Sequence, residues 1–167
     1  MSSQILAQRF PDHLVVGIDK SSARLARALP RTPPNCLLIH GDVIDLWRLI
    51  KGEELPVRRH YLLFPNPWPK ADQVKRRFHA HPVFETMVSL APYFELRTNW
   101  LLYAKELVNA LTLLGQKPTI ERKVDDDFMT LFEKKYQESS CPVYMVQNRL
   151  MAFPEQEQLS NVIPDYG

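Results

Sequence analysis

The strongest constraint on the fold is an alternation of strand-like and helix-like segments along the chain. Short apolar, β-branched runs are typical of strands, and longer runs with apolar residues every three or four positions are typical of helices. The predicted strands are residues 13–19, 36–42, 61–64, 94–98, 118–124 and 141–150. The predicted helices are residues 4–10, 20–29, 43–50, 82–94, 99–115 and 125–138. Strands separated by helices need crossover connections, so the pattern predicts an α/β fold: a mainly parallel sheet with helices on both faces.

The chain is long enough for one domain. Its 167 residues can bury a sizeable core. We assign residues 1–150 to this domain and residues 151–167, which show little periodicity, to a C-terminal tail. A hydrophobic share of 45% and a charged share of 24% are typical of a soluble globular protein. We expect a monomer or a homodimer.

No segment of the sequence indicates a membrane or a metal. No apolar run approaches the length that crosses a bilayer, and the first residues lack the pattern of a secretory signal. Cys36 and Cys141 stand far apart, and neither has a metal-ligand partner at a recognisable spacing. The sequence therefore predicts a cytoplasmic protein with two reduced cysteines, no metal site and no membrane contact.

The segment "YLLFPNPWPK", residues 61–70, combines an apolar strand with three prolines. Each proline fixes its own φ, lacks an N–H, and disfavours the helical conformation in the residue before it. Pro65 should therefore end the strand, and we expect Asn66 and Trp68 to lie on a stiff, extended loop. The alternative is a proline-rich surface turn with a half-buried tryptophan.

Polar side chains stand at or just after the ends of four predicted strands: Asp19, Asp42, Asn66 and Asn99. In open α/β sheets, ligands bind outside the carboxyl ends of the strands. Asp19 suits the hydroxyls of a ribose. Asp42 suits the amine of an adenine, with the backbone N–H of Val43 as a donor. Together they outline an adenosine pocket, although either acid could instead cap the following helix.

The glycines do not form the loop that usually accompanies such a pocket. The chain has five glycines, and no two are close enough for a G-x-G turn. The sequence begins within what would be the helix after that turn. We therefore expect the first strand and the glycine-rich loop of a nucleotide-binding domain to be missing.

A basic stretch follows the prolines directly. Residues 70–77 carry the bases Lys70, Lys75, Arg76 and Arg77 against the single acid Asp72. Clustered bases can neutralise the phosphates of a nucleic acid. A solvated helix face is the alternative explanation of such a run.

Six segments in this order resemble the bacterial tRNA (guanine-N7)-methyltransferases, which are class I S-adenosylmethionine-dependent enzymes. They are "RFPDHLVVGID", "HGDV", "LLFPNPWPK", "KRRF", "TNW" and "TLFEKKY". The resemblance covers residues 1–150, and its most specific part is the F-P-x-P-W-P-K loop followed by K-R-R. It implies a Rossmann-like class I methyltransferase sheet, S-adenosylmethionine as cofactor, tRNA as partner, and methyl transfer to N7 of a guanine in the variable loop.

The resemblance also implies roles for individual residues. Asp19, Asp42, Val43 and Asn66 would contact the methyl donor, and Asn66 would be the catalytic or substrate-orienting residue. The substrate would be contacted by Lys70, Asn99, Thr130, Leu131, Phe132 and Glu133. The tRNA backbone would be met by Lys75, Arg76 and Arg77.

Three positions depart from the family pattern: Asn66 and Asn99 replace aspartates, and Gln73 replaces a histidine. Guanine N7 has an available lone pair, so its methylation needs alignment rather than a general base. A carboxylate would stabilise the positive charge that moves onto the purine, whereas asparagine keeps orientation and loses charge. We expect a rate lower by about two to three orders of magnitude.

Two other functions fit the same residues. A homologue that has lost these carboxylates could bind tRNA or a partner protein without transferring a methyl group. A methyltransferase acting on an exocyclic amine is the other alternative. Such enzymes carry an Asp/Asn-Pro-Pro-aromatic loop, which Asn66, Pro67 and Trp68 approximate.

Overall fold

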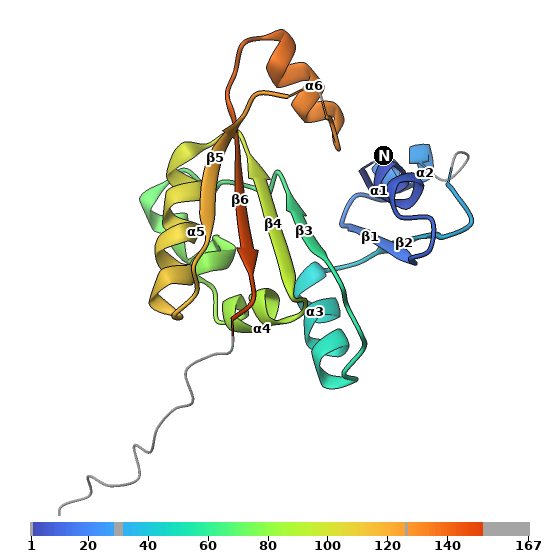
Figure 1. Cartoon of the computed structure of the whole chain (residues 1–167), viewed down its shortest axis with the longest axis horizontal. Helices are drawn as coiled ribbons and strands as arrows, with labels where there is room; N and C mark the ends of the chain where they lie inside the picture. Colours follow the sequence, from blue (N-terminus) through green and yellow to red (C-terminus); the bar gives the residue numbers. More distant parts are fainter. Residues whose placement is uncertain (1, 29–31, 126, 152–167) are drawn as a thin grey trace, which may run out of the picture.

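The structure is a computed structural model that describes residues 2–28, 32–125 and 127–151. It is an α/β fold with two separate sheets (Figure 1). The strands are β1 (Val15–Asp19), β2 (Cys36–His40), β3 (His60–Leu63), β4 (Tyr93–Thr98), β5 (Thr119–Lys123) and β6 (Val143–Arg149). The helices are α1 (Ser2–Arg9), α2 (Ser22–Ala28), α3 (Val43–Gly52), α4 (Phe84–Ser89), α5 (Leu101–Leu113) and α6 (Leu131–Glu138).

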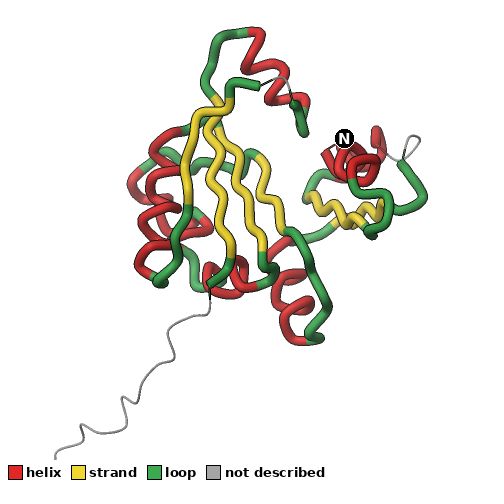
Figure 2. Tube along the Cα trace, viewed as in Figure 1, coloured by secondary structure: helices red, strands yellow, loops and turns green. Residues whose placement is uncertain are grey.

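The four-stranded sheet is mixed rather than mainly parallel. β1 and β2 form a two-stranded parallel sheet, and the second sheet has the order β3-β4-β6-β5. β3 and β4 are parallel, but β6 runs antiparallel to both of its neighbours. The prediction of a mainly parallel sheet is therefore wrong for the C-terminal strands. The reason is visible in Figure 2: α6 lies beyond the end of the sheet instead of crossing a face, so the chain returns in the opposite direction.

The core lies on one face of the four-stranded sheet. Alternate residues of a strand point to opposite faces, and Phe94 and Leu96 of β4 point to the face packed against Leu107 of α5. The other core residues include Trp47 of α3 and Met87 of α4. The opposite face of β4 carries Tyr93, Glu95 and Arg97, and charged groups occupy it instead of a helix-packed apolar layer.

Helix α1 packs closely on β1 because of a glycine. A Cβ atom built on Gly17 would lie 2.1 Å from the Oγ of Ser3 and 3.0 Å from a methyl of Leu38, so a larger residue would push α1 away. Asn35 completes this contact, since its side-chain amide donates to the carbonyl groups of Ala7 (2.9 Å) and His13 (3.0 Å). The N-terminal elements are thus joined by a close helix–strand approach and by the side-chain amide of Asn35.

Two helices, α4 and α6, differ most from the prediction. α6 begins at Leu131 rather than at residue 125, because Thr130 is its N-cap and forms a capping box with Glu133. The helix predicted over residues 82–94 is shorter, Phe84–Ser89, because β4 already begins at Tyr93. Of the predicted tail, residues 152–167 lie outside the described residues.

Candidate functional site

The proline loop follows the carboxyl end of β3, as predicted. Asn66 is exposed and Trp68 half-buried. The Oδ1 atom of Asn66 accepts a hydrogen bond from the backbone N–H of Trp68 at 3.2 Å, which closes a tight turn. On the outer side of the loop, the guanidinium of Arg76 lies 4.9 Å from the centre of the Trp68 ring.

The backbone of this loop is not extended throughout, and this corrects the prediction at Trp68. Phe64 has φ of 49° and Trp68 has φ of 46°, both in the left-handed region. For residues with a side chain this region costs about 1–2 kcal/mol each, so other contacts must hold them there. The prolines exclude the right-handed helical conformation as expected, but the conformation that replaces it is set by contacts from outside the loop.

Arg77 supplies the contacts at the Trp68 end of the loop. Its side chain is 3% exposed. Its Nε and Nη2 atoms donate to the carbonyl oxygens of Pro67 and Trp68, and Nη1 donates to both carboxylate oxygens of Glu106 on α5. The ring of Trp100 lies 5.0 Å from the same guanidinium. The structure therefore places Arg77 inside the protein, whereas Lys75 and Arg76, predicted with it as tRNA contacts, are exposed.

Asn99 and Asn66 come to the same edge of the sheet. β3 and β4 are paired in parallel up to Leu63 and Arg97, and the N–H of Phe64 continues the pairing to the carbonyl of Arg97 at 2.8 Å. Asn99 is the first residue after β4 and is half-buried. The topology thus brings the two asparagines together at one edge, as the sequence predicted, and leaves Lys70 exposed beside them.

The segment predicted to contact the substrate, residues 130–133, lies against the start of the proline loop. The ring of Phe64 is 5.6 Å from the rings of both Phe132 and Tyr136 on α6. Leu131 and Phe132 are exposed, so this aromatic surface is accessible. Phe64 and Tyr136 were missed by the sequence reasoning. The aromatic spacing of four residues in α6, which places Phe132 and Tyr136 on one helix face, is the signal that could have found Tyr136.

Glu133 is oriented inward. Its side chain is 1% exposed: Oε1 pairs with Nη1 of Arg97 at 2.5 Å, and Oε2 accepts the N–H groups of Met129 (2.6 Å) and Thr130 (2.8 Å). Thr130, also buried, accepts from the N–H of Glu133 at 3.0 Å. These two predicted substrate contacts therefore fix the N-terminus of α6 and leave Leu131 and Phe132 as its accessible residues.

Arg97 links this segment to the middle of the sheet. Its Nε atom donates to Oε1 of Glu95 at 2.6 Å, and Glu95 also accepts a hydrogen bond from the hydroxyl of Tyr93. Burial, together with the hydrogen bond to Glu95, raises the pKa of Tyr93 above its usual range. Glu95 and Glu133 share the guanidinium of Arg97, and their other oxygens accept hydrogen bonds from neutral donors.

The two predicted donor-binding acids lie on neighbouring parallel strands. Oδ1 of Asp19, the last residue of β1, accepts from the N–H of Ser21 at 2.8 Å and from Nη2 of Arg24 at 2.9 Å. Asp42, just after β2, caps α3 through the N–H of Ile44 at 2.9 Å and pairs with Nζ of Lys20 at 2.8 Å. The hydrogen bond from Lys20, followed by that from Ile44, lowers the pKa of Asp42.

The contacts of these acids include the capping roles that the sequence left open. Among the described residues, Oδ2 of Asp19 has no hydrogen bond, and a Cβ atom built on Gly41, between the two strand ends, meets nothing within 4 Å. Val43 is the first residue of α3. The space at the Cβ position of Gly41 is therefore open, and the remaining oxygen of Asp19 can accept from a ligand that carries hydroxyl or amine donors.

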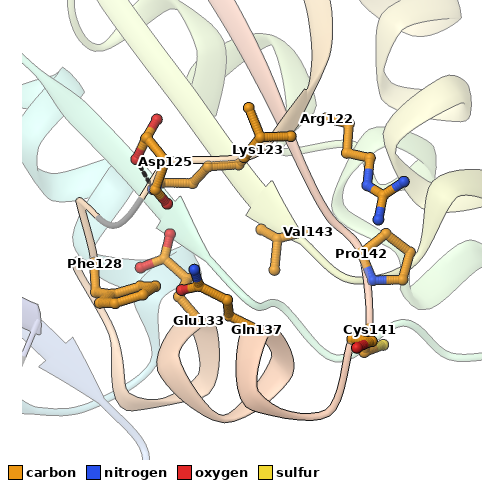
Figure 3. Close-up of a pocket in the computed structure, with 11 residues that line it drawn as sticks. Arg122, Lys123, Asp125, Phe128, Glu133, Gln137, Cys141, Pro142 and Val143 are labelled. Carbon is orange, nitrogen blue, oxygen red and sulfur yellow. Dashed lines mark hydrogen bonds and ion pairs between the residues drawn. The ribbon is translucent and has the colours of Figure 1, made fainter.

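Two cavities of the described structure lie largely away from the predicted residues. A cavity of about 260 Å³ beneath α6 is lined by residues of β5, α6 and the start of β6, and Glu133 is the one predicted residue in its wall (Figure 3). A second cavity, about 270 Å³, adjoins the charged face of β4. The predicted site is therefore an open surface over strand ends rather than either of these cavities.

The described part of the chain shows neither a metal-binding cluster nor a membrane-spanning helix. Across residues 2–28, 32–125 and 127–151, no three histidine, cysteine or acidic side chains are close enough to hold a metal ion. Within the same ranges, no helix has the length and apolar character needed to cross a membrane.

Comparison with known families places most of the chain in one of them. The model of the family Methyltransf_4, described as "Putative methyltransferase", matches residues 2–146. The tRNA (guanine-N(7)-)-methyltransferase of Zymomonas mobilis is 29% identical over 159 residues, which cover 83% of this chain and 65% of that protein. The chain thus spans slightly less than two thirds of the length of this relative.

Solved structures of methyltransferases share the fold. The antibiotic-resistance methyltransferase Kmr superimposes with a TM-score of 0.58 at 18% identity, covering 89% of this chain and 81% of that one. SMU.776, whose crystal structure is complexed with SAH, gives a TM-score of 0.53 at 13% identity and covers 80% of this chain and 38% of that one. At these identities the likeness concerns the fold.

Proposed function

Since the chain belongs to the Methyltransf_4 family of methyltransferases, we propose that it transfers a methyl group to N7 of a guanine in tRNA, in the variable loop. S-adenosylmethionine is the cofactor that the family and the fold indicate. The observation that carries the proposal is the juxtaposition at one sheet edge: a strained proline loop, Asn99 after the neighbouring strand, and the aromatic surface of α6.

The proposed chemistry requires alignment more than proton transfer. Guanine N7 offers its lone pair without a general base. S-adenosylmethionine supplies the methyl group as an electrophile. The amides of Asn66 and Asn99 can both donate and accept along the edge of a guanine. Phe132, exposed beside Phe64, offers a ring face on which a base can stack.

The acids of β1 and β2 fit the adenosine part of the cofactor. Asp19 has one oxygen free for a ribose hydroxyl, and the space at Gly41 admits a ligand next to Asp42. An adenine amine can donate to Asp42, and the N–H of Val43 lies at the free N-terminus of α3. The ion pair of Asp42 with Lys20 is exposed, with 68% of the lysine side chain accessible, so it competes weakly with a ligand.

The exposed bases beside the loop are suited to tRNA phosphates. Lys70, Lys75 and Arg76 are all accessible, and Arg76 already lies over Trp68. Replacing Lys75 and Arg76 with alanine should weaken tRNA binding and lower the slope of log affinity against log salt by about 1 per lost contact. An unchanged slope would show that these bases form only a solvated face.

A second function, tRNA binding without methyl transfer, is favoured by one specific observation. Asn66 and Asn99 carry no charge, so the site lacks the carboxylates that would stabilise a cationic purine. Restoring both, as Asn66→Asp with Asn99→Asp, should raise the methylation rate by about 100-fold if electrostatics is the missing term. A double variant that binds the cofactor but gains no rate would contradict this electrostatic argument.

The decisive experiment combines a binding measurement with a substrate that lacks the reacting atom. Calorimetric titration with S-adenosylmethionine tests the donor pocket, with Asp42→Asn as the variant and Asp45→Asn, an exposed acid of α3, as its control. Transfer of a labelled methyl group is then measured on a tRNA transcript and on the same transcript made with 7-deazaguanine.

The outcomes separate the candidate functions. Label on the normal transcript and none on the 7-deaza transcript supports N7 methylation. Label on both transcripts favours an exocyclic amine, because 7-deazaguanine keeps that group. Saturable binding of tRNA without any label, in a folded sample, favours the non-catalytic homologue.

A further inference from the structure

The conformation of the proline loop depends on a side chain from outside the loop. Pro65, Pro67 and Pro69 have no N–H to donate, and within the described loop the one side-chain contact to a backbone N–H is that of Asn66 with Trp68. The residue before a proline prefers extended backbone, yet Trp68 has φ of 46°. Proline content alone therefore does not account for the observed loop.

We propose that Arg77 is a positioning residue for methyl transfer. Its guanidinium, clamped by Glu106, holds the carbonyl groups of Pro67 and Trp68, and thereby fixes the loop that presents Asn66 and Trp68 to the substrate. The catalytic part of this proposal rests on the proposed function, whereas the loop clamp is a property of the fold itself.

The hydrogen bonds of Arg77 match the shape of a guanidinium. Nε lies 3.1 Å from the carbonyl oxygen of Pro67 and 3.2 Å from that of Trp68, and Nη2 lies 2.9 Å from the latter. Nη1 lies 2.7 and 2.6 Å from the two oxygens of Glu106. A planar fork of donors can serve both partners at once, whereas a lysine ammonium cannot reproduce this geometry.

Glu106 connects the clamp to the rigid part of the molecule. It lies on α5, one residue before Leu107, whose side chain is 0% exposed in the core. Its Oε2 atom is also 3.0 Å from Nε2 of His79, and the ring of His79 packs edge-on against Tyr103 at 4.7 Å. Arg77 and Glu106 therefore connect the loop to α5 and the core, in addition to the connection through the loop's own backbone.

The burial of Arg77 separates its role from that of its neighbours. Lys75 and Arg76 are exposed, whereas Arg77 is 3% exposed and its guanidinium is already neutralised by Glu106. A phosphate could reach the first two residues without any rearrangement. Reaching Arg77 would require breaking the contacts with both the loop and α5.

The test follows the three tryptophans by fluorine NMR of protein labelled with 5-fluorotryptophan. Trp68 belongs to the loop, Trp100 lies on the guanidinium, and Trp47 is buried in the core at 2% exposure and serves as an internal control. Trp68→Phe and Trp100→Phe assign the signals. The variants are Arg77→Lys and the milder Glu106→Gln, with Arg48→Lys, an exposed arginine of α3, as the matched control.

The proposal expects the Trp68 and Trp100 signals to shift or broaden in both clamp variants, while the Trp47 signal and the whole spectrum of Arg48→Lys stay unchanged. An unchanged Trp68 signal in a folded Arg77→Lys protein would overturn the proposal, because the loop would then keep its conformation without the Arg77 guanidinium. If Arg77→Lys fails to fold, which loss of the native Trp47 signal would reveal, Glu106→Gln decides in the same way.

Methylation kinetics test the catalytic part. A loop displaced by about 1 Å lowers kcat by about 100-fold. The affinity for tRNA and its salt dependence should change by less than about twofold, because neutralised Arg77 provides no phosphate contact. A loss of tRNA affinity with unchanged kcat would overturn the positioning role. If the unmodified chain transfers no methyl group at all, the proposed function fails, while the NMR measurement still decides whether the clamp exists.

Discussion

The two halves of the molecule differ in how completely they bury their own residues. In the half built on the four-stranded sheet, Met87, Leu96 and Leu107 are 0% exposed. In the N-terminal half, built on β1 and β2, Leu14 is 68% and Leu37 is 47% exposed. The buried apolar residues described there are Leu6, Ala7 and Cys36. The proposed guanine-binding side, next to the four-stranded sheet, is thus supported by a packed core. The proposed cofactor-binding side, next to β1 and β2, has few buried apolar residues beneath it.

Few contacts tie the N-terminal half to the rest. Arg9 of α1 pairs with Asp127, and the guanidinium of Arg59 lies 5.0 Å from the ring of Phe10 and 4.9 Å from that of Tyr93. Among the described residues, β1 pairs only with β2 and β3 pairs only with β4, so no strand pairing joins the two sheets. The part of the proposed site that would hold the guanine is therefore built on the packed core, and we expect the stability of the proposed donor pocket to depend more strongly on its ligand.

The largest expected contrast is between a buried and an exposed ion pair. Arg97→Met leaves Glu95 and Glu133 buried without a cation, and it should lower the free energy of unfolding by about 4 kcal/mol. Arg24→Met removes the partially exposed pair with Asp19 and should cost less than about 1 kcal/mol. Urea unfolding followed by circular dichroism measures both. Equal losses would mean that the two halves do not differ in this way.

A cavity mutation should show a slightly smaller contrast. Leu107→Ala in α5 should cost about 3 kcal/mol, because it removes contacts that are fully excluded from water. Leu14→Ala, in the exposed entry to β1, should stay within about 0.5 kcal/mol of the unmodified protein. The same unfolding experiment measures the pair, and a large loss for Leu14→Ala would reveal packing in the N-terminal half that its exposure does not suggest.

Acid should destabilise the packed half through His60. Burial lowers the pKa of His60 to about 4, and its neutral ring accepts from Nε1 of Trp47 at 3.1 Å. The unfolded chain, with the ordinary histidine pKa of about 6.5, binds the proton more readily, so stability is complete above pH 6.5 and falls as the pH drops toward 4.

Protonation linked to His60 alone should lower the free energy of unfolding by about 2 kcal/mol at pH 5. Burial also lowers the pKa of His79, so this histidine adds to the loss in the same direction. Unfolding curves at pH 7 and pH 5 measure the effect. His60→Leu should flatten the dependence, and His13→Asn, an exposed histidine before β1, should leave it unchanged. An undiminished pH dependence in His60→Leu would assign the effect to groups other than His60.

The local elements were largely predictable from the sequence, and the sheet order was not. Apolar runs and breakers placed the six strands that the structure describes, since those signals are local. β6 lies between β4 and β5, and this pairing joins residues far apart in the chain. The helix–strand alternation predicts parallel neighbouring strands only if every helix crosses a face of the sheet. The capping box of Thr130 and Glu133 starts α6 past the end of the sheet, and the order changes there.

The candidate site was predictable to the extent that topology decides it. Asn66 and Asn99 follow paired parallel strands, so their proximity could be inferred from the pattern. The basic run was different, because charge alone does not say which of Lys75, Arg76 and Arg77 points inward. That choice depends on Glu106, which lies 29 residues further along the chain. Long-range pairing of this kind leaves no local signal in a single sequence.

The smallest expected effect tests the comparison most directly, because it should appear in one half only. At ten times its Kd, S-adenosylmethionine should stabilise whatever it binds by about 1.4 kcal/mol, which slows amide hydrogen exchange by about tenfold where exchange occurs through local opening. We expect this slowing in β1 and β2, which border the two acids, and none in β4 and β6, whose amides we expect to exchange only when the core opens.

Asp42→Asn should abolish the slowing while keeping the helix cap, since asparagine caps as well as aspartate, and Asp45→Asn should leave the slowing in place. Uniform slowing across both sheets would show that the halves open together, and the contrast between a packed guanine-binding side and a ligand-dependent cofactor-binding side would then be wrong.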